Sequence, residues 1–304
     1  MRRSIPGWFM RVAWLSLVVA RAASAASDAT HLVGPFTLAD YPRAVIDRPL
    51  TLPRGVVEGE VGFSFASQTL DPAFLGVGGV DRWDTDVALR VGVTDWLQLE
   101  AATSFNLDYH QRHADFEGIF TETRPTLSSW NRTVPVRLSV LALDTETLDT
   151  AVTLTIPFLS HSTRTNFLRS GSIEVSNGPN RVVPEVDLGA PTRWRLTDWL
   201  WLRAAQDLFA VSTVDGTASF AFNVGIGVQP LPIFAATLDT RIATVAFDGS
   251  GHSTSETLAD RGTILLEGTL APCRYFDLIG DLDLPDVGSG VDDWLARLAF
   301  RVRI

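Results

Sequence analysis

The chain has 304 residues, of which 46% are hydrophobic and 10% aromatic, and it carries a formal net charge of −10 at pH 7. The negative charge argues against nucleic acid as a partner, and the single cysteine, Cys273, excludes an internal disulfide. No stretch after the N-terminal region approaches the roughly 18 uninterrupted apolar residues of a transmembrane helix, so the apolar residues are dispersed, as alternating strands would disperse them.

Residues 1–25 have the three parts of a secretory signal peptide. Arginines give a positive start, an apolar stretch follows at 12–20, and an Ala-Ser-Ala sequence ends the segment. We therefore expect an exported protein whose mature chain begins near Ala26. The leader contains four arginines and no acids, so its removal takes the net charge from −10 to near −14.

Residues 26–55 differ in character, with prolines and no strand pattern. The sequence RPLTLPRG indicates an extended, semi-rigid stretch leading to the first strand. We expect this segment to stay in the periplasm or to enter the barrel as a plug.

After residue 55, about twelve segments alternate apolar and polar residues with the period of a β-strand. The first, VVEGEVGFSF, places Val57, Val61 and Phe63 on one face and Glu58 and Glu60 on the other. WDTDVALRVGV repeats this arrangement next. The remaining segments fall near 97–106, 132–143, 150–159, 183–195, 199–211, 217–229, 233–246, 261–271, 275–284 and 293–304.

The connections between these segments alternate in length. Short turns rich in Asp and Pro fall at 94–95, 144–149, 197–198, 230–232 and 272–273. The links between them are longer and fall at 67–82, 107–131, 160–182, 248–260 and 285–292, and only the link at 212–216 is brief. Short turns at one end and long polar loops at the other are typical of an up-and-down barrel with an even number of strands. We predict an all-β fold over residues 56–304, an antiparallel up-and-down transmembrane β-barrel of about 12 strands.

The tryptophans of the mature chain all lie at predicted strand ends, where the aromatic girdles of an outer-membrane barrel meet the lipid headgroups. Trp96, Trp199 and Trp201 have the polar parity of their strands. The candidate girdle residues have the apolar parity and are Trp83, Trp130, Trp194 and Trp294.

Opposite charges recur at the polar parity in mid-strand, where an outer-membrane barrel has its polar lumen. If the last strand pairs with the first, the arginines of the last strand lie between two acidic rows, and each pair contributes about 0.2 to 1 kcal/mol. The candidate lumen-lining charges are Glu58, Glu60, Asp84, Asp86, Arg90, Glu100, Glu185, Asp187, Arg193, Arg203, Asp277, Asp281, Asp283, Arg297, Arg301 and Arg303.

Two sequences resemble parts of known outer-membrane proteins. LARLAFRVRI looks like the terminal strand that the barrel-assembly machinery of Gram-negative bacteria recognises, with Ile304 where an aromatic residue is usual. GVTDWLQLEAATSF, echoed by RLTDWLWLRAA at 195–205, resembles a group of outer-membrane channel proteins that includes those linked to phenol degradation by the meta-cleavage pathway. The resemblance implies a cell outer-membrane barrel that is surrounded by outer-membrane lipid.

Two partial matches to catalytic sites lack essential residues. Asp84 and Asp86 resemble the paired acids of omptin-type proteases, but the chain has no D-x-H pair. The sequence at 129–132 resembles a fragment of the outer-membrane phospholipase motif, but neither a serine nor a histidine stands in the segment upstream. We therefore expect no enzymatic activity.

A possible metal site lies in the predicted loop at 107–131, where Asp108, His110, His113 and Asp115 are close in sequence. Imidazole and carboxylate groups bind divalent metals, but loops are polar by default. We expect a solvated loop, with no metal and no cofactor.

A barrel of about twelve strands has a lumen that side chains need not fill. We therefore expect a passive channel for small solutes through a charge-lined lumen, with a mild preference for cations. The main alternative is a structural or partner-binding barrel that is closed by paired charges, by residues 26–55 or by the loop at 107–131. A surface enzyme and a soluble barrel are the less favoured alternatives.

Overall fold

The computed structural model describes residues 37–69, 77–114, 120–122, 129–167, 173–177, 185–204, 208–212, 218–247, 253–257, 262–287 and 294–304. The predicted signal peptide and the start of the predicted 26–55 segment lie outside the described residues. Within the part of the chain that is described, no helix has the length and hydropathy to cross a membrane.

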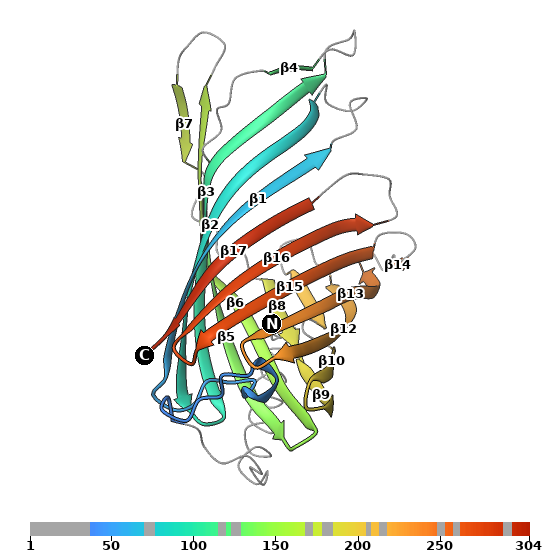
Figure 1. The fold of residues 1–304 in the computed structure, drawn as a ribbon. Coiled ribbons are helices and arrows are strands. Elements are labelled where there is room, and N and C mark those ends of the chain that lie inside the picture. Colours follow the sequence, from blue (N-terminus) through green and yellow to red (C-terminus); the bar gives the residue numbers. More distant parts are fainter. Residues whose placement is uncertain are drawn as a thin grey trace, which may run out of the picture.

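The strands form one closed antiparallel barrel with 12 positions around its wall, which we call staves and which each hold one strand or two short consecutive strands (Figure 1). Ten staves are single strands: β1 (Val57–Thr69), β2 (Val77–Thr94), β3 (Leu97–Ala114), β5 (Ser129–Asp144), β6 (Leu148–Phe167), β12 (Ala218–Leu231), β13 (Phe234–Phe247), β15 (Gly262–Cys273), β16 (Phe276–Val287) and β17 (Trp294–Arg303). Two staves are each built from two short strands: β8 (Glu185–Gly189) with β9 (Thr192–Thr197), and β10 (Leu200–Ala204) with β11 (Phe209–Ser212). Three further short strands extend the hairpins: β4 (Phe120–Glu122), β7 (Ile173–Asn177) and β14 (Ser253–Thr257).

The barrel closes where β1 pairs with both β2 and β17. In this register Glu60 lies opposite Arg301 of β17, and Glu58 lies opposite Arg303 and Arg90 on its two sides. The arginines of the last strand therefore lie beside the acids of the first, as the alternation predicted.

Each of the twelve predicted strands coincides with one stave, but the predicted loops at 67–82, 107–131, 160–182 and 248–260 are partly wrong. β2 already begins at Val77, and β14 lies within the predicted loop at 248–260. β3 continues to Ala114 and β6 continues to Phe167. The residues there are polar on both faces, which removes the alternation, whereas the main-chain hydrogen bonds of a hairpin do not depend on the side chains. Asp108, His110 and His113 therefore lie on β3 rather than in a loop, and Asp115 lies outside the described residues.

The two faces of the barrel wall are inverted relative to a soluble barrel. Large apolar side chains are exposed on the outer face, including Val61, Phe63, Val87, Leu89, Leu238, Leu266, Leu298, Phe300 and Val302. The polar side chains between them, such as Glu60 and Ser64, are buried inside. An apolar outer band is what a barrel in lipid presents, so the prediction of a transmembrane β-barrel is confirmed.

Two glycines on the inner face make close approaches possible. A Cβ added at Gly227 would collide with the ring of Trp201, and one at Gly92 would collide with the main chain of Pro53. Because these positions carry no side chain, the Trp201 ring and the main chain of Pro53 can come close to the strands there.

Candidate functional site

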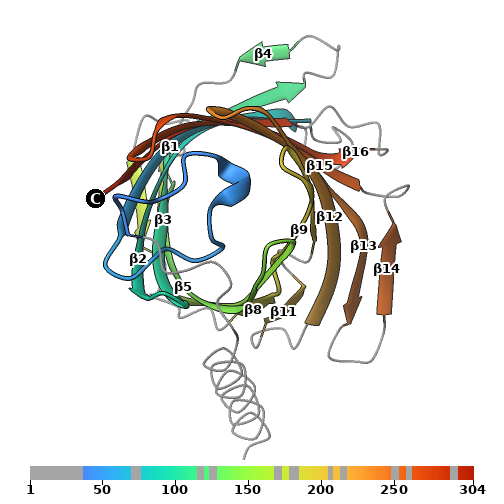
Figure 2. The same cartoon turned by 60° about the horizontal axis from the view of Figure 1, so that its bottom comes forward.

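Residues 37–56, which we call the N-terminal segment, lie inside one end of the barrel. Figure 2 shows this stretch within the ring of strands, and Figure 1 shows it at the end that carries the short turns. The segment has no strand and contains one short 3-10 helix, η1 (Val45–Asp47). Residues 37–55 are the part of the predicted 26–55 stretch that the structure describes.

Apolar side chains of the N-terminal segment pack on the inner face. Ile46 is 1% exposed and contacts Trp201 of β10 and Ala235 of β13. Tyr41, Leu52 and Val56 form a second buried cluster within the segment. Burying an apolar side chain of this size contributes about 1.5 to 3 kcal/mol, so these contacts favour the docked state of the segment.

Two glutamines of the wall bind the main chain of the N-terminal segment. The Ile46 amide donates to Gln229 Oε1 at 3.0 Å, and the Leu52 amide donates to Gln98 Oε1 at 2.9 Å. The Gly55 amide also donates to the Gly92 carbonyl at 2.8 Å. These bonds satisfy main-chain donors in a segment that has no ladder of its own.

Arg48 joins the N-terminal segment to a buried carboxylate. Its Nη1 and Nη2 lie 2.7 and 2.9 Å from the two oxygens of Asp277, which is 0% exposed. Arg303 Nη2 donates to the same carboxylate at 2.5 Å. A bidentate pair of this kind fixes both distance and orientation, so Arg48 sets the position of the segment along the wall.

Arg193 of β9 binds the same stretch from the other side. Its guanidinium donates to the carbonyls of Val45, at 3.2 Å, and of Arg48. Asp149 of β6 holds the guanidinium at 2.5 Å and also accepts from Arg195 at 3.0 Å. Asp149 therefore holds the Arg193 side chain in the orientation in which it contacts the N-terminal segment.

Tyr41 lies between two guanidinium groups. Arg303 is 5.0 Å and Arg48 is 5.7 Å from the centre of its ring, within the range of cation–π contacts. Burial raises the pKa of the Tyr41 phenol above its ordinary value, and the charge of Arg303 only partly offsets this. The phenol therefore stays neutral at physiological pH.

Further inside the barrel, Arg297 bridges three strands. It donates to Glu60 of β1 at 2.5 Å, to both oxygens of Asp86 of β2 at 2.9 and 2.5 Å, and to Asp281 of β16 at 3.0 Å. One guanidinium thus spans the junction where the barrel closes.

Arg90 and Arg301 extend the same network. Arg90 binds Glu58 and Glu60 at 2.8 Å each and Glu100 at 3.1 Å. Arg301 lies 2.8 Å from Glu60 and 3.4 Å from Glu58. Glu58 and Glu60 are each shared between arginines, so the inner face from β16 to β3 carries a continuous charge network.

The predicted charges fall into several groups. The network contains Glu58, Glu60, Asp86, Arg90, Glu100, Asp277, Asp281, Arg297, Arg301 and Arg303. Arg193 pairs instead with Asp149, and Arg203 pairs with Asp239 of β13. Asp84 and Asp187 lie on β2 and β8, Asp283 lies on β16, and the side chain of Glu185 lies outside the description. That these charges line a conducting pore stays a prediction.

Three of the predicted girdle tryptophans are exposed on the outer face. They are Trp83, Trp194 and Trp294. The ring centres of Trp83 and Trp294 lie 4.6 and 5.2 Å from that of Phe65, and the side chain of Trp130 lies outside the description. Their position relative to lipid headgroups stays a prediction.

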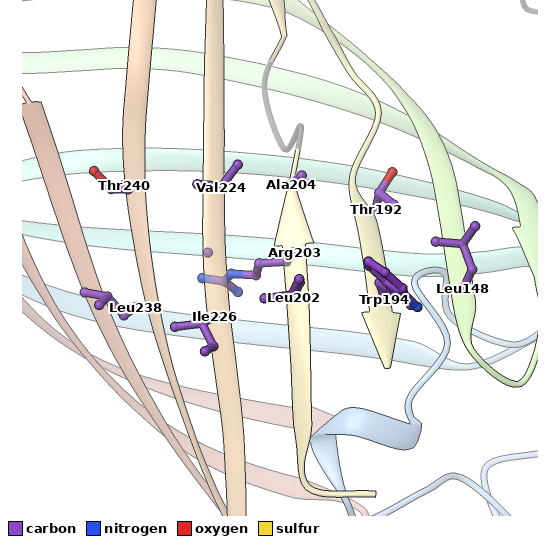
Figure 3. A pocket seen from close by; sticks show the side chains of 11 residues that line it. Leu148, Thr192, Trp194, Leu202, Arg203, Ala204, Val224, Ile226, Leu238 and Thr240 are labelled. Atoms are coloured by element: carbon purple, nitrogen blue, oxygen red, sulfur yellow. The ribbon is translucent and has the colours of Figure 1, made fainter. Parts of the chain in front are cut away.

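An apolar groove of about 530 Å³ lies on the outer face near Trp194 (Figure 3). Leu202, Ile226 and Leu238 also line it. These are outer-face residues of β9, β10, β12 and β13, so the groove belongs to the surface that the apolar band forms.

Sequence reasoning did not single out Trp201, Gln98 or Gln229 as functional. Trp201 stands at a strand end but is only 3% exposed, because it points inward onto the N-terminal segment. A signal was present: Gln98 and Trp201 occupy the same position in the repeated sequence T-D-W-L-x-L. Both contact the segment.

We expect Trp201→Ala to loosen the N-terminal segment. Truncating a buried tryptophan costs about 3 kcal/mol, which raises the undocked fraction about a hundredfold if the loss falls on docking. Limited trypsin digestion of the refolded protein measures this as faster cleavage after Arg43. Trp199→Ala, which removes an exposed tryptophan from the neighbouring turn, is the control and should leave the rate unchanged. Equal rates for both variants would show that Trp201 does not hold the segment.

No family model matches the sequence, and no curated protein matches it. Among solved structures, an outer membrane channel from Pseudomonas putida F1 is similar with a TM-score of 0.53 at 13% identity, over 84% of this chain and 97% of that chain. The translocator domain of the autotransporter NalP from Neisseria meningitidis has a TM-score of 0.47 at 11% identity, over 97% of this chain and 98% of that chain. The KdgM porin has a TM-score of 0.44 at 5% identity, over 80% of this chain and 98% of that chain. The first likeness shows that the fold is that of an outer-membrane β-barrel.

Proposed function

We propose that the protein is a passive channel for small solutes in the cell outer membrane. The observation that carries this proposal is the inversion of the barrel wall, with apolar residues outside and a charge network inside. An aqueous path is consistent with this arrangement, because charged side chains are less costly on a face that water reaches than in an apolar core. The similar channel from Pseudomonas putida F1 adds support at the level of the fold.

The charge network has a second role in this proposal. Shared arginines and acids hold β16, β17, β1 and β2 together at the closing junction, and they also present fixed charge to a passing solute. The acids Asp84 and Asp86, which resemble a protease pair, serve no catalysis here, since Asp86 is engaged by Arg297. The remaining partners are outer-membrane lipid around the apolar band and the barrel-assembly machinery at β17.

The N-terminal segment narrows the end of the barrel that carries the short turns. Its buried contacts with Trp201, Gln98, Gln229 and Asp277 favour the alternative of a closed, non-transporting barrel. The two functions differ in whether the docked segment leaves a path for solutes.

Single-channel recording separates these two functions. We expect the refolded mature chain, placed in a planar bilayer, to give discrete current steps. The same preparation should shift on a gel when heated, as a folded barrel does. Silence from a preparation that shows this shift would favour the closed barrel.

A further inference from the structure

Three carboxylates form a patch on the inner face, at the edge of the charge network. Glu267 lies on β15, and Asp281 and Asp283 lie on β16. Glu267 and Asp281 are direct partners across the two strands, so their side chains point to the same side. Like charges placed directly opposite destabilise a sheet, so this pair is not explained by folding.

The carboxylates of the patch have fewer arginine partners than the carboxylates of the closing junction. Asp281 accepts from Arg297, but that guanidinium also serves Glu60 and Asp86. No arginine of the described residues lies within 4.0 Å of Glu267 or Asp283. The positive charges that act on them from farther away are that of Arg203, which is itself paired with Asp239, on Glu267, and that of Arg241 on Asp283. The only hydrogen bond to Glu267 from these residues comes from the Thr269 hydroxyl, at 3.3 Å.

Polar atoms around the patch are buried without a partner in the described protein. They include one carboxylate oxygen each of Asp281 and Asp283, and the hydroxyl of Thr237. Thr237 is 6% exposed and lies directly opposite Glu267 in the pairing of β13 with β15, so its side chain is on the inner face beside that carboxylate. Leaving such groups unsatisfied costs free energy, and a hydrated cation supplies both the charge and the hydrogen bonds that they lack.

We propose that Glu267, Asp281, Asp283 and Thr237 form a cation-binding station on the inner wall, which gives the channel its selectivity for small cations. This inference rests on the proposed channel function and assigns the charge class of its solutes. Among the described residues, no group of three or more His, Cys, Asp or Glu is arranged to hold a metal ion. The station therefore binds a cation through its water shell, weakly enough to release it.

The test is the reversal potential of the refolded mature chain in a potassium chloride gradient. Salt is kept near about 0.1 M, where the Debye length is about 10 Å and fixed charges still act on a passing ion. The variant E267Q/D283N removes the two carboxylates of the patch that form no ion pair with the described residues, while keeping the side-chain shapes. The control E146Q/D198N removes the same charges from exposed short turns.

We expect the wild-type chain and E146Q/D198N to favour potassium over chloride. In E267Q/D283N the permeability ratio should fall at least about fivefold, because each unit charge about 4 Å from the ion contributes a factor of about five in a water-like dielectric. A conducting wild type without cation preference, or an unchanged ratio in E267Q/D283N, overturns the station and leaves the channel standing. An equal fall in E146Q/D198N also overturns it, because overall charge then accounts for the effect. A folded wild-type chain that gives no current contradicts both the cation-binding station and the channel function.

Discussion

A mature chain that begins at Gly55, and so lacks most of the N-terminal segment, should conduct several times more current per step than the full mature chain. The segment lies within the ring of strands at one end of the barrel (Figure 2), and Ile46 and Arg48 are buried there against the wall. Removing it takes these side chains out of the interior at that end of the barrel. Paired single-channel recordings of the two chains in the same bilayer measure the difference.

The barrel should fold without this segment, because Asp277 keeps Arg303 as a partner when Arg48 is gone. A full-length Arg48→Gln variant is the matched control, because it keeps the length of the segment but loses the ion pair with Asp277. Its current should switch between the level of the full mature chain and the level of the truncated chain. If the truncated chain gives the same current as the full chain, the N-terminal segment does not obstruct the path.

Arg297→Ala should destabilise the barrel more than any other single arginine substitution on the inner face. It leaves Glu60, Asp86 and Asp281 without the guanidinium that joins them across the closing junction. Breaking a buried ion pair by removing one partner costs about 3 kcal/mol. Urea unfolding of the protein in lipid vesicles, followed by tryptophan fluorescence, measures the shift of the midpoint.

Arg241→Ala is the control for Arg297→Ala. Arg241 is exposed, and no described acid lies within ion-pair distance of it, so its removal should change stability by less than about 1 kcal/mol. The double variant Arg297→Ala/Asp86→Asn should recover part of the lost stability, because fewer carboxylates then lack a partner. Equal midpoints for the Arg297 and Arg241 variants would mean that the junction does not depend on its charge network.

The barrel itself could be predicted from the sequence because its signal is local. In the strand of Glu58 and Glu60, alternation fixes which side chains share a face, and the short Asp- and Pro-containing turns fix which strands are neighbours. The pairing of Arg301 with Glu60 then follows from closure. Strand ends were less predictable, since β3 and β6 continue where both faces are polar.

The site inside the barrel could not be predicted in the same way. The N-terminal segment has no period, and its partners Asp277, Gln229 and Gln98 lie far away in the sequence. Even the pairing of Arg203 with Asp239 depends on Gly225, where a Cβ would collide with the carboxylate. Contacts of this kind depend on the three-dimensional path of the chain, which alternation does not encode.

The contacts of Gln98, Gln229 and Arg193 are made to main-chain atoms of the N-terminal segment rather than to its side chains. A main-chain atom is the same whatever residue carries it, so these three groups accept many sequences that follow the same path. Arg48 is different, because its side chain makes the contact with Asp277. The segment is therefore held to the wall partly through main-chain atoms and partly through the side chains of Ile46 and Arg48. Exchanging its exposed residues while these two are kept should give pores of different width in an unchanged wall.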